Sequence, residues 1–325
     1  MPEAFRATAE IEKPQAQLIQ MATAHFVSHL LYVAAQLNLA DYLTDSPKTA
    51  EELAKSTATD VQSLYRLMRT LASLGLFTED AAHRFSLRPV GEALKIGTSG
   101  SVRGAVLTLT GDLVTKSLCQ LHYSVQTGKA GFEKAFGAPL FEWLANHPAE
   151  ASMFSETMVG FHGAEPAAVA AAYDFSQFET IIDVGGATGN LLTAILGRHH
   201  GPRGILFDLA HVVRDAPALI EARGLTARVS IEAGNFFENA PAAGDAYLLS
   251  HIIHDWSEAE CLTILDNCRR GMKPDGRLLI IEMVLPTGDA PHPGKMLDII
   301  TLTVTGGERT RARVSRAARQ SRIPS

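Results

Sequence analysis

The sequence predicts an α/β protein: a doubly wound, Rossmann-like parallel sheet that follows an all-α, winged-helix N-terminal part. Three observations lead to this prediction. From about residue 166, short β-branched runs alternate with helical patterns, as in parallel sheets covered on both faces. A glycine-rich loop at 185–189 follows the first of these runs. Residues 49–87 fit the order helix, turn, helix and hairpin.

Length and composition indicate two soluble domains. The chain has 325 residues, more than one core usually holds, with 46% hydrophobic and 20% charged residues. We expect no membrane contact, because no apolar run approaches the roughly 18–20 residues that cross a bilayer. The N-terminus lacks the apolar region of a secretory signal. Cys119, Cys261 and Cys268 form no metal motif, which fits a cytoplasmic protein.

The charge distribution argues against nucleic acid as a partner. The net charge is −6, but residues 309–325 hold six arginines and no acid, so the rest of the chain has 23 basic and 35 acidic residues. An acidic body does not suit a phosphate backbone. The would-be recognition helix has only Arg66 and Arg69 as basic residues. A winged-helix regulator with a ligand-sensing domain is therefore the disfavoured alternative.

The first long helical pattern, residues 18–43, carries apolar residues at helical spacing with few charges on any face. A helix this apolar needs a partner surface. It is either a core helix of its own domain or a helix at which two subunits associate.

The next segment begins with two helix-start signals. Thr49 opens a capping box with Glu52, and Asp60 caps a longer helix that ends at Gly75. A hairpin over 77–85 completes the winged-helix pattern. Further on, residues 132–165 are helical and rich in Phe, Met and Trp. That stretch is either core or part of a ligand pocket, since pockets favour domain boundaries.

The second half of the chain alternates strands and helices. The expected strands are 180–184, 204–208, 228–233, 246–252 and 277–284, and the expected helices are 189–198, 211–223, 257–272 and 295–304.

The glycine loop fits a nucleoside ligand without phosphates. A dinucleotide fingerprint would need glycine at position 184, where this chain has Val184, and Asp183 would repel a pyrophosphate. S-adenosylmethionine (SAM) carries an adenosine, no phosphate and a positive charge. Gly185, Gly186 and Gly189 would let the backbone approach its methionine part.

Asp208 ends the second strand, 25 residues after Asp183. An acid at this place in a Rossmann-like fold accepts hydrogen bonds from a ribose. Alone, Asp208 would be a solvated turn residue, but together with the glycine loop it is expected to bind the cofactor's ribose.

Six motifs occur in a familiar order: DVGGATGN, FDLAHVVRDAP, AGNFFE, HIIHDWSEAEC, GRLLIIEMVLP and TGGERT. Over residues 15–310 the chain resembles the SAM-dependent O-methyltransferases, in particular caffeate-type plant enzymes and bacterial enzymes that methylate polyketide, phenazine or carotenoid hydroxyls. The resemblance implies a class I SAM methyltransferase fold, an N-terminal dimerisation domain, a homodimer and a hydroxylated small-molecule acceptor.

The expected domain boundaries follow from these patterns. They are a winged-helix-containing dimerisation domain at 1–110, a helical linker with acceptor-pocket helices at 111–165, a SAM-binding domain at 166–308 and an atypical arginine-rich tail at 309–325.

His254 lies just past the fourth expected strand, at the edge where doubly wound sheets bind ligands. A free phenol has a pKa of about 10 and needs a base at neutral pH, and histidine, with a pKa near 6.5, is suited to that task. The resemblance makes His254 the base. We expect His251 to be structural and no metal to bind. Residues three apart on a strand face opposite ways; an intervening helical turn could let His251 and His254 converge, but no third ligand has metal spacing.

The resemblance also implies two acids that orient His254, namely Glu282 and Glu308. An acid that closes an apolar strand, as Glu282 does, is costly without a partner. Asp255 is expected to cap the helix that begins at Ser257 or to pack locally.

Further site residues come from the same resemblance. The expected cofactor contacts are Asp183, Asn235, Phe236, Ser250 and Trp256, and the expected acceptor-pocket residues are Phe154 and Met158. Asn235 stands where the family usually has Asp, and Trp256 is expected near the adenine.

Two departures from the family pattern remain. Ala187 makes the loop GGATG where GGGTG is common. The TGGERT motif is one residue short and leads into the arginine-rich tail, so we expect the final strands of the sheet to be missing, which exposes a sheet edge. A SAM-binding but catalytically impaired homologue is therefore the second alternative.

Overall fold

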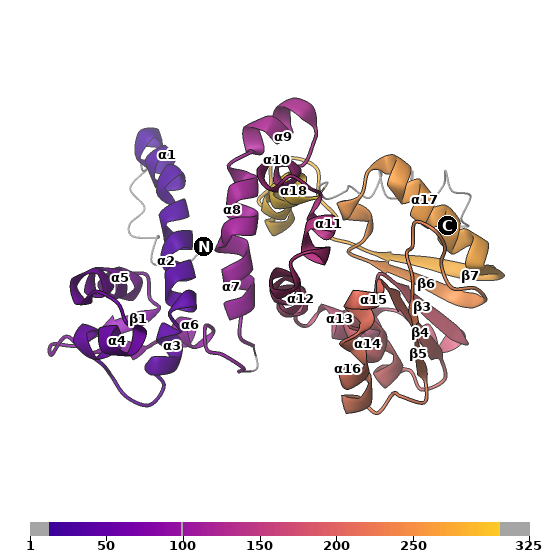
Figure 1. Ribbon diagram of the computed structural model, residues 1–325, viewed down its shortest axis with the longest axis horizontal. Helices are drawn as coiled ribbons and strands as arrows, with labels where there is room; N and C mark the ends of the chain where they lie inside the picture. Colours follow the sequence, from indigo (N-terminus) through magenta and orange to yellow (C-terminus); the bar gives the residue numbers. More distant parts are fainter. Residues whose placement is uncertain (1–12, 99, 306–325) are drawn as a thin grey trace. The chain divides into compact units, whose positions relative to one another are not determined.

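The computed structural model describes residues 13–98 and 100–305, with the backbone alone at 155–156 and 159–162. The chain divides into two compact units. Unit 1 comprises residues 1–115 with 156–161, and unit 2 comprises residues 116–155 with 162–325. Figure 1 shows the described elements of each unit.

Unit 1 is helical with one small hairpin. Its elements are α1 (Pro14–Thr23), α2 (His25–Gln36), α3 (Leu39–Tyr42), α4 (Ala50–Thr57), α5 (Val61–Ser73), β1 (Phe77–Glu79), β2 (Phe85–Leu87), α6 (Pro89–Glu92) and α7 (Arg103–Thr110), and α8 (Asp112–Leu118) crosses into unit 2. The single helix expected over 18–43 is wrong, because α2 ends at Gln36 and Asn38 adopts the left-handed conformation with φ of 53°.

The predicted caps of α4 and α5 are confirmed. The Glu52 amide donates to the Thr49 hydroxyl at 3.3 Å, and the Thr49 amide donates to the Glu52 carboxylate at 2.7 Å. Asp60 accepts from the amide of Ser63 at 2.8 Å. Each bond satisfies an amide that the first helical turn leaves without an intrahelical partner. These caps orient the two helices over the hairpin, whose Phe77 is fully buried.

The stretch Pro14–Gln36 corrects one expectation. By length and composition it is apolar enough to cross a membrane. The expectation that no run reaches this length is therefore wrong; uncharged Gln, Thr, Ser and His separate the apolar residues and hide the run. Only 11% of its apolar 18-residue segment is buried. Five large apolar side chains of α1 and α2 are exposed: Leu18, Ile19, Met21, Phe26 and Val33.

Unit 2 begins with helices and continues with a five-stranded parallel sheet. The helices are α9 (Leu121–Thr127), α10 (Gly131–Phe136), α11 (Leu140–Ala145), α12 (Pro148–His162), α13 (Glu165–Ala172), α14 (Asn190–Arg198), α15 (Ala210–Val213), α16 (Ala216–Ala222), α17 (Glu258–Gly271) and α18 (Pro293–Val304), with short 3₁₀ turns η2 (Phe175–Gln177) and η3 (Ile253–Asp255). The strands are β3 (Thr180–Val184), β4 (Arg203–Asp208), β5 (Val229–Ala233), β6 (Gly244–Ser250) and β7 (Met272–Ile281).

The strand order β5-β4-β3-β6-β7 explains where a ligand can bind. The chain moves outward from β3 through β4 to β5, and then returns to the other side of β3 to form β6. The direction therefore reverses between β3 and β6, and this is the point at which open α/β sheets bind ligands, at the strands' carboxyl ends. Figure 1 shows helices on both faces of this sheet.

Side chains that alternate along the strands build two cores. Ile181 and Leu248 belong to a cluster with α14 and α16 on one face. Ile182 and Tyr247 belong to a second cluster with α17 on the other. The alternation follows from the period-two geometry of a strand, and burial on both faces confirms the predicted doubly wound sheet.

Several boundaries differ from those expected. β6 ends at Ser250 and not at residue 252, and β7 spans Met272–Ile281 and not 277–284. The helix expected at 211–223 is divided into α15 and α16, and Pro217 stands in the first turn of the second. Proline has no amide to continue a helix, so a new helix begins there.

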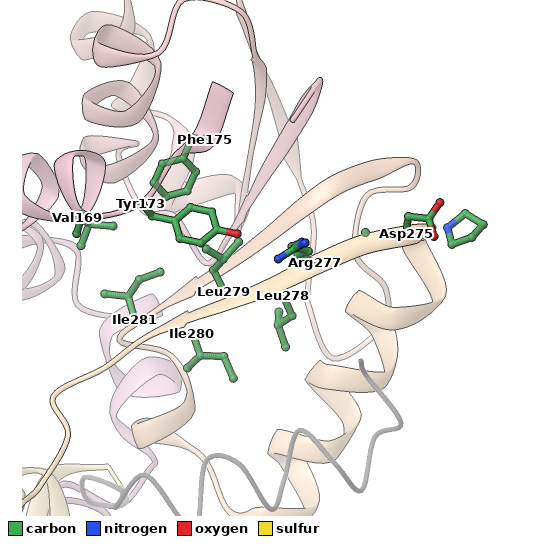
Figure 2. A pocket seen from close by; sticks show the side chains of 12 residues that line it. Val169, Tyr173, Phe175, Asp275, Arg277, Leu278, Leu279, Ile280 and Ile281 are labelled. Atoms are coloured by element: carbon green, nitrogen blue, oxygen red, sulfur yellow. The ribbon is translucent and has the colours of Figure 1, made fainter. Parts of the chain in front are cut away.

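A cavity of about 720 Å³ lies along β7, which is an edge strand among the described residues. Tyr173, Phe175, Leu279 and Ile281 are among its lining side chains (Figure 2). None of the residues that line it is a predicted site residue. The expected loss of the last strands, the arginine-rich tail and Glu308 lie outside the described residues.

Candidate active site

The glycine loop connects β3 to α14 and is held against β4. The amides of Gly185 and Gly186 both donate to the carbonyl of Phe207, at 2.8 and 3.3 Å. Gly185 and Gly189 have φ of 72° and 87°, a region that disfavours side chains. A Cβ on Gly186 would lie 2.6 Å from Cγ of Asp183. The loop thus packs directly on the carboxyl group that precedes it, and only glycine permits this approach.

Asp183 lies near the end of β3 with a fully buried carboxyl group, 1% exposed. Neither carboxyl oxygen makes a hydrogen bond of normal geometry within the described residues. Burial, followed by the nearby Asp208 carboxylate, raises its pKa to about 7, although the backbone N–H of Leu192 acts in the lowering direction. Burial disfavours the charged form of this carboxyl group, so a cationic ligand beside it would favour the carboxylate.

Asp208 ends β4 on the other side of the loop. One carboxylate oxygen accepts from the amide of Ala187 at 2.9 Å, and the other accepts from the amide of Leu209 at 2.7 Å. Burial raises the pKa of Asp208, while these two amides lower it. Each oxygen retains a second lone pair, so the fixed carboxylate can still accept from a ligand's hydroxyl groups.

Ala187 occupies a strained position in the loop. Its φ is 51°, in the left-handed region that costs an alanine about 1–2 kcal/mol. We expect Ala187→Gly to stabilise the protein by about 1 kcal/mol, since the flexibility of glycine offsets part of the gain. The unfolding free energy should rise accordingly in a denaturant titration.

Ala58→Gly is the matched control, because Ala58 has φ of 52° in unit 1. It should stabilise similarly without changing cofactor affinity. A lower unfolding free energy for Ala187→Gly would contradict this account of the loop.

The predicted cofactor residues after β5 lie in an aromatic group. Asn235 begins a turn, with its side-chain oxygen accepting from the Phe237 amide at 3.0 Å. Trp256 packs edge-to-face on Phe237 and Phe236, with ring centroids 4.7 and 5.8 Å apart. Asn267 donates to the Phe236 carbonyl at 2.7 Å and so ties this turn to α17. These contacts bring Asn235, Phe236 and Trp256 together. Ser250 ends β6.

One residue of this aromatic group was not anticipated. Phe141, on α11, stacks on Trp256 at 5.4 Å and meets Phe154 edge-on at 6.4 Å. The only sequence signal was the general richness of residues 132–165 in aromatic side chains. Met158 falls in unit 1, whereas Phe154 is in unit 2, so their shared role in an acceptor pocket stays a prediction.

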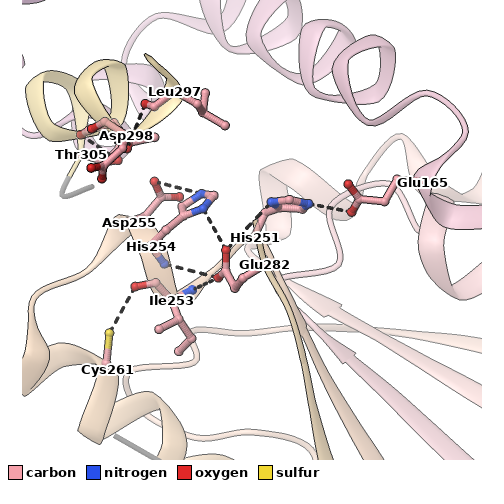
Figure 3. A network of polar contacts seen from close by, with 11 residues as sticks. Glu165, His251, Ile253, His254, Asp255, Cys261, Glu282, Leu297, Asp298 and Thr305 are labelled. Atoms are coloured by element: carbon pink, nitrogen blue, oxygen red, sulfur yellow. Dashed lines mark hydrogen bonds and ion pairs between the residues drawn. The ribbon is translucent and has the colours of Figure 1, made fainter. Parts of the chain in front are cut away.

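His254 and Glu282 form the centre of the site. Nδ1 of His254 lies 2.9 Å from Oε2 of Glu282, and both side chains are largely buried, at 12% and 5% exposed. The other oxygen of Glu282 accepts from the amides of Ile253 and His254, at 2.8 and 3.4 Å (Figure 3). These two amides belong to η3, which begins three residues after β6 ends, so the turn holds the carboxylate beside the imidazole.

Asp255 does not cap α17. Ser257 accepts from the amide of Glu260 at 3.4 Å and forms a capping box with it. The carboxylate of Asp255 instead lies 3.5 Å from Nε2 of His254. The local packing that was the other expectation for Asp255 is therefore the one observed.

The two histidines converge, which was expected only if a helical turn intervened, and the expectation that no third ligand has metal spacing is wrong. His251 has φ of 55°, and η3 follows it, so the strand ends before His254 and the side chains do not alternate. The rings lie 5.6 Å apart, and one ligand atom from each, with one from Glu282, lies within 4.8 Å of the others. Nε2 of His251 lies 2.7 Å from a carboxylate oxygen of Glu165. Glu165 was not anticipated from the sequence.

Comparison with known proteins places these features in a family context. Residues 119–321 match the family model for an O-methyltransferase domain, and residues 19–95 match that for an O-methyltransferase dimerisation domain. Phenazine O-methyltransferase PhzM from Lysobacter antibioticus is 42% identical, over 90% of this chain and 85% of its own length.

Two solved structures share the whole architecture. The crystal structure of LaPhzM matches with a TM-score of 0.90 and 40% identity, over 95% of this chain and 93% of its own. That of NcsB1 from neocarzinostatin biosynthesis, in complex with S-adenosyl-L-homocysteine and 1,4-dihydroxy-2-naphthoic acid, has a TM-score of 0.82 and 29% identity, over 96% and 94% of the two chains.

Proposed function

This chain belongs to the SAM-dependent O-methyltransferase family, and we propose that its acceptor is a hydroxyl of a small aromatic or polyketide-type secondary metabolite, with His254 as the general base. Two relatives support the acceptor class: PhzM is a phenazine O-methyltransferase, and NcsB1 was crystallised with a dihydroxynaphthoic acid.

The observation that carries the proposal is the short contact between His254 and Glu282. A carboxylate 2.9 Å from Nδ1 favours the tautomer in which Nδ1 carries the proton. Nε2 then keeps its lone pair and can accept the proton of a phenol as the oxygen attacks. Glu282 stabilises the imidazolium that results, in the manner of the acid in a catalytic triad. Glu308, which lies outside the described residues, is proposed as a second catalytic acid.

The residues around the glycine loop fit SAM. This cofactor supplies a methyl group on a positively charged sulfur. Asp183 offers a buried carboxylate without a hydrogen bond of normal geometry in the described residues, which suits a cationic ligand. Gly185, Gly186 and Gly189 leave room for close approach, and Asp208 would accept from the ribose hydroxyls. The aromatic group around Trp256, with Asn235 and Phe236 in it, is proposed to hold the adenine, and Ser250 is proposed to contact the cofactor at the end of β6.

The test is a methyl-transfer assay. The enzyme is incubated with SAM and a panel of phenols, naphthols and hydroxyphenazines, and formation of S-adenosylhomocysteine is measured with formation of the methyl ether. We expect the two products in equal amounts, with at least one acceptor, and no turnover with the same acceptor already O-methylated at its reactive hydroxyl. Cofactor binding without turnover on any member of the panel would support the impaired homologue instead.

We further propose that the chain is a cytoplasmic homodimer in which the exposed apolar faces of α1 and α2 meet those of a second copy. The match to a dimerisation domain begins at residue 19, within α1. The side chains of Leu18 and Phe26 are 66% and 56% exposed, and such surface favours association. Cys261 and Cys268 are buried as thiols rather than as disulfides, in keeping with a reducing compartment.

Light scattering after size exclusion should give twice the chain mass of 34.9 kDa. The double variant Leu18→Glu/Phe26→Glu should shift the protein to the monomer, because buried unpaired charge is costly at an apolar interface. Val125→Glu is the matched control, since Val125 is 70% exposed on α9 in unit 2 and its variant should stay dimeric. A monomeric wild-type protein would refute the proposal.

A further inference from the structure

The three side chains at the end of β6 and β7 form a set of metal ligands as well as a catalytic pair. His251, His254 and Glu282 each place one ligand atom within 4.8 Å of the other two. Two imidazoles and one carboxylate are the donor set of one common class of zinc site, in which a fourth position stays open. Tetrahedral ligands on zinc are separated by about 3.3 Å, so the observed separations of 2.9 and 4.0 Å around Oε2 of Glu282 need only small side-chain shifts.

The surroundings of these ligands independently favour a metal. A histidine that binds a metal usually donates its second ring N–H to a carboxylate or carbonyl, which fixes its orientation. Nε2 of His251 lies 2.7 Å from Glu165, and Nδ1 of the same ring faces Glu282 at 4.0 Å (Figure 3). His251 is therefore already oriented as a ligand, because Nε2 is hydrogen-bonded to Glu165 and Nδ1 faces Glu282.

The other two ligands are anchored as well. One oxygen of Glu282 accepts from the backbone amides of η3, which leaves Oε2 directed to both imidazoles. Nε2 of His254 has Asp255 at 3.5 Å. The three ligand side chains are 5–13% exposed, so a bound ion would be shielded from water. Glu282 and Glu165 together offset the two charges of a divalent ion.

We propose that His251, His254 and Glu282 bind a divalent transition-metal ion of the zinc class, and that this ion inhibits methyl transfer. Nitrogen donors favour Zn²⁺, Co²⁺ or Ni²⁺ over Mg²⁺ and Ca²⁺, which prefer oxygen ligands. Coordination through Nδ1 of His254 places the ring proton on Nε2. The nitrogen proposed to receive the acceptor's proton then has no lone pair for it. The inhibitory part rests on the proposed function, whereas the binding part does not.

The test uses Co²⁺ and Zn²⁺ on the full-length enzyme. Co²⁺ in a nitrogen- and oxygen-ligated site of low symmetry absorbs visible light, so a titration should saturate at one equivalent per chain. Zn²⁺ should abolish that absorption and should inhibit methyl transfer with the same half-saturation. His251→Asn keeps a residue that tolerates the left-handed backbone but removes one imidazole. It should weaken Co²⁺ binding about 10-fold or more and restore turnover in the presence of Zn²⁺.

Two further variants make the result specific. Glu165→Gln removes the acid that orients His251 and should weaken Co²⁺ binding about 10-fold; it tests the proposal by itself if His251→Asn fails to fold. His83→Asn is the matched control, because His83 has φ of 58° but is an exposed residue of unit 1. It should bind Co²⁺ as the wild type does.

Absence of a one-equivalent Co²⁺ signal in the wild type would overturn the metal site, and so would equal Co²⁺ affinity in wild type, His251→Asn and Glu165→Gln. If Co²⁺ binds as expected but no acceptor is methylated in metal-free buffer, the proposed function fails while the metal site stands. The two claims are thus separable.

Discussion

Replacing His254 by asparagine is expected to lower kcat by about 10²–10⁴-fold, the usual contribution of a general base. The side-chain amide introduced by His254→Asn can still donate toward Glu282, so the carboxylate keeps a partner and the fold should persist. What is lost is the lone pair that receives the phenol proton. SAM affinity should change by no more than about two-fold, because the carboxylates proposed to bind the cofactor, Asp183 and Asp208, are on β3 and β4. Single-turnover kinetics with saturating SAM and acceptor measure this loss directly.

His251→Asn serves as the control for His254→Asn. It makes the same chemical change three residues earlier, at a ring whose nearest acid is Glu165, 2.7 Å away. Turnover in metal-free buffer should stay within about three-fold of the wild type, since this ring is not proposed to touch the acceptor. Equal losses in both variants would show that the region responds to any perturbation, and the assignment of His254 as base would fail.

Replacing Asp183 by asparagine is expected to have opposite effects on stability and on cofactor binding. The folded pKa of Asp183, about 7, is raised above the ordinary value of 3.8 by burial and then by Asp208. A raised pKa means that the folded protein holds this proton more tightly than the unfolded chain does. The contribution of Asp183 to the free energy of unfolding is thus fully present below about pH 4 and is lost as the pH rises to about 7. The contribution is at most roughly 4 kcal/mol.

Asp183→Asn removes that loss, so the cofactor-free variant should be more stable than the wild type at pH 8 and nearly equal to it at pH 4. SAM binding at pH 8 should weaken by about 10-fold or more, because a cationic ligand loses its buried carboxylate. Urea unfolding at both pH values and calorimetry with SAM measure the two effects. Less stability at pH 8 would contradict the account of the burial.

Asp245→Asn is expected to change the stability in the opposite direction to Asp183→Asn. Although partial burial acts to raise the pKa of Asp245, hydrogen bonds from Lys273 and from the Thr180 amide hold that pKa below its usual value. Its stabilising contribution is present above the unfolded pKa and is lost as the pH falls through the folded pKa. Asp245→Asn should therefore destabilise the protein at pH 8, where Asp183→Asn stabilises it.

Local signals predicted the features that depend on neighbouring residues. The caps at Thr49 and Asp60 are each a side chain and an amide three residues apart, so the sequence contains the whole interaction. The glycine loop was also predictable from local sequence, because only glycine readily adopts the positive φ found at Gly185 and Gly189. Alternation of short β-branched runs with helical patterns predicted the parallel sheet and its two covered faces.

The features that the sequence did not predict depend on contacts between residues far apart in the chain, which no local pattern encodes. Glu165 meets His251 across 86 positions, and Phe141 reaches Trp256 from a separate helix. The meeting of His251 with His254 requires a left-handed residue at a strand end, where a histidine gives only a weak local preference. Asp183 was identified as a cofactor residue, but its unusual pKa arises from burial under the loop and from Asp208.

The most direct measurement of the central claim is the rate of methyl transfer by His254→Asn and wild type over a series of phenols of decreasing pKa. An acceptor that is already ionised at the assay pH does not need a base. If His254 removes the acceptor's proton, the deficit of the variant should shrink steadily along the series and nearly vanish for the most acidic phenols. A deficit that stays constant across the series would contradict that role and would leave His254 a structural residue.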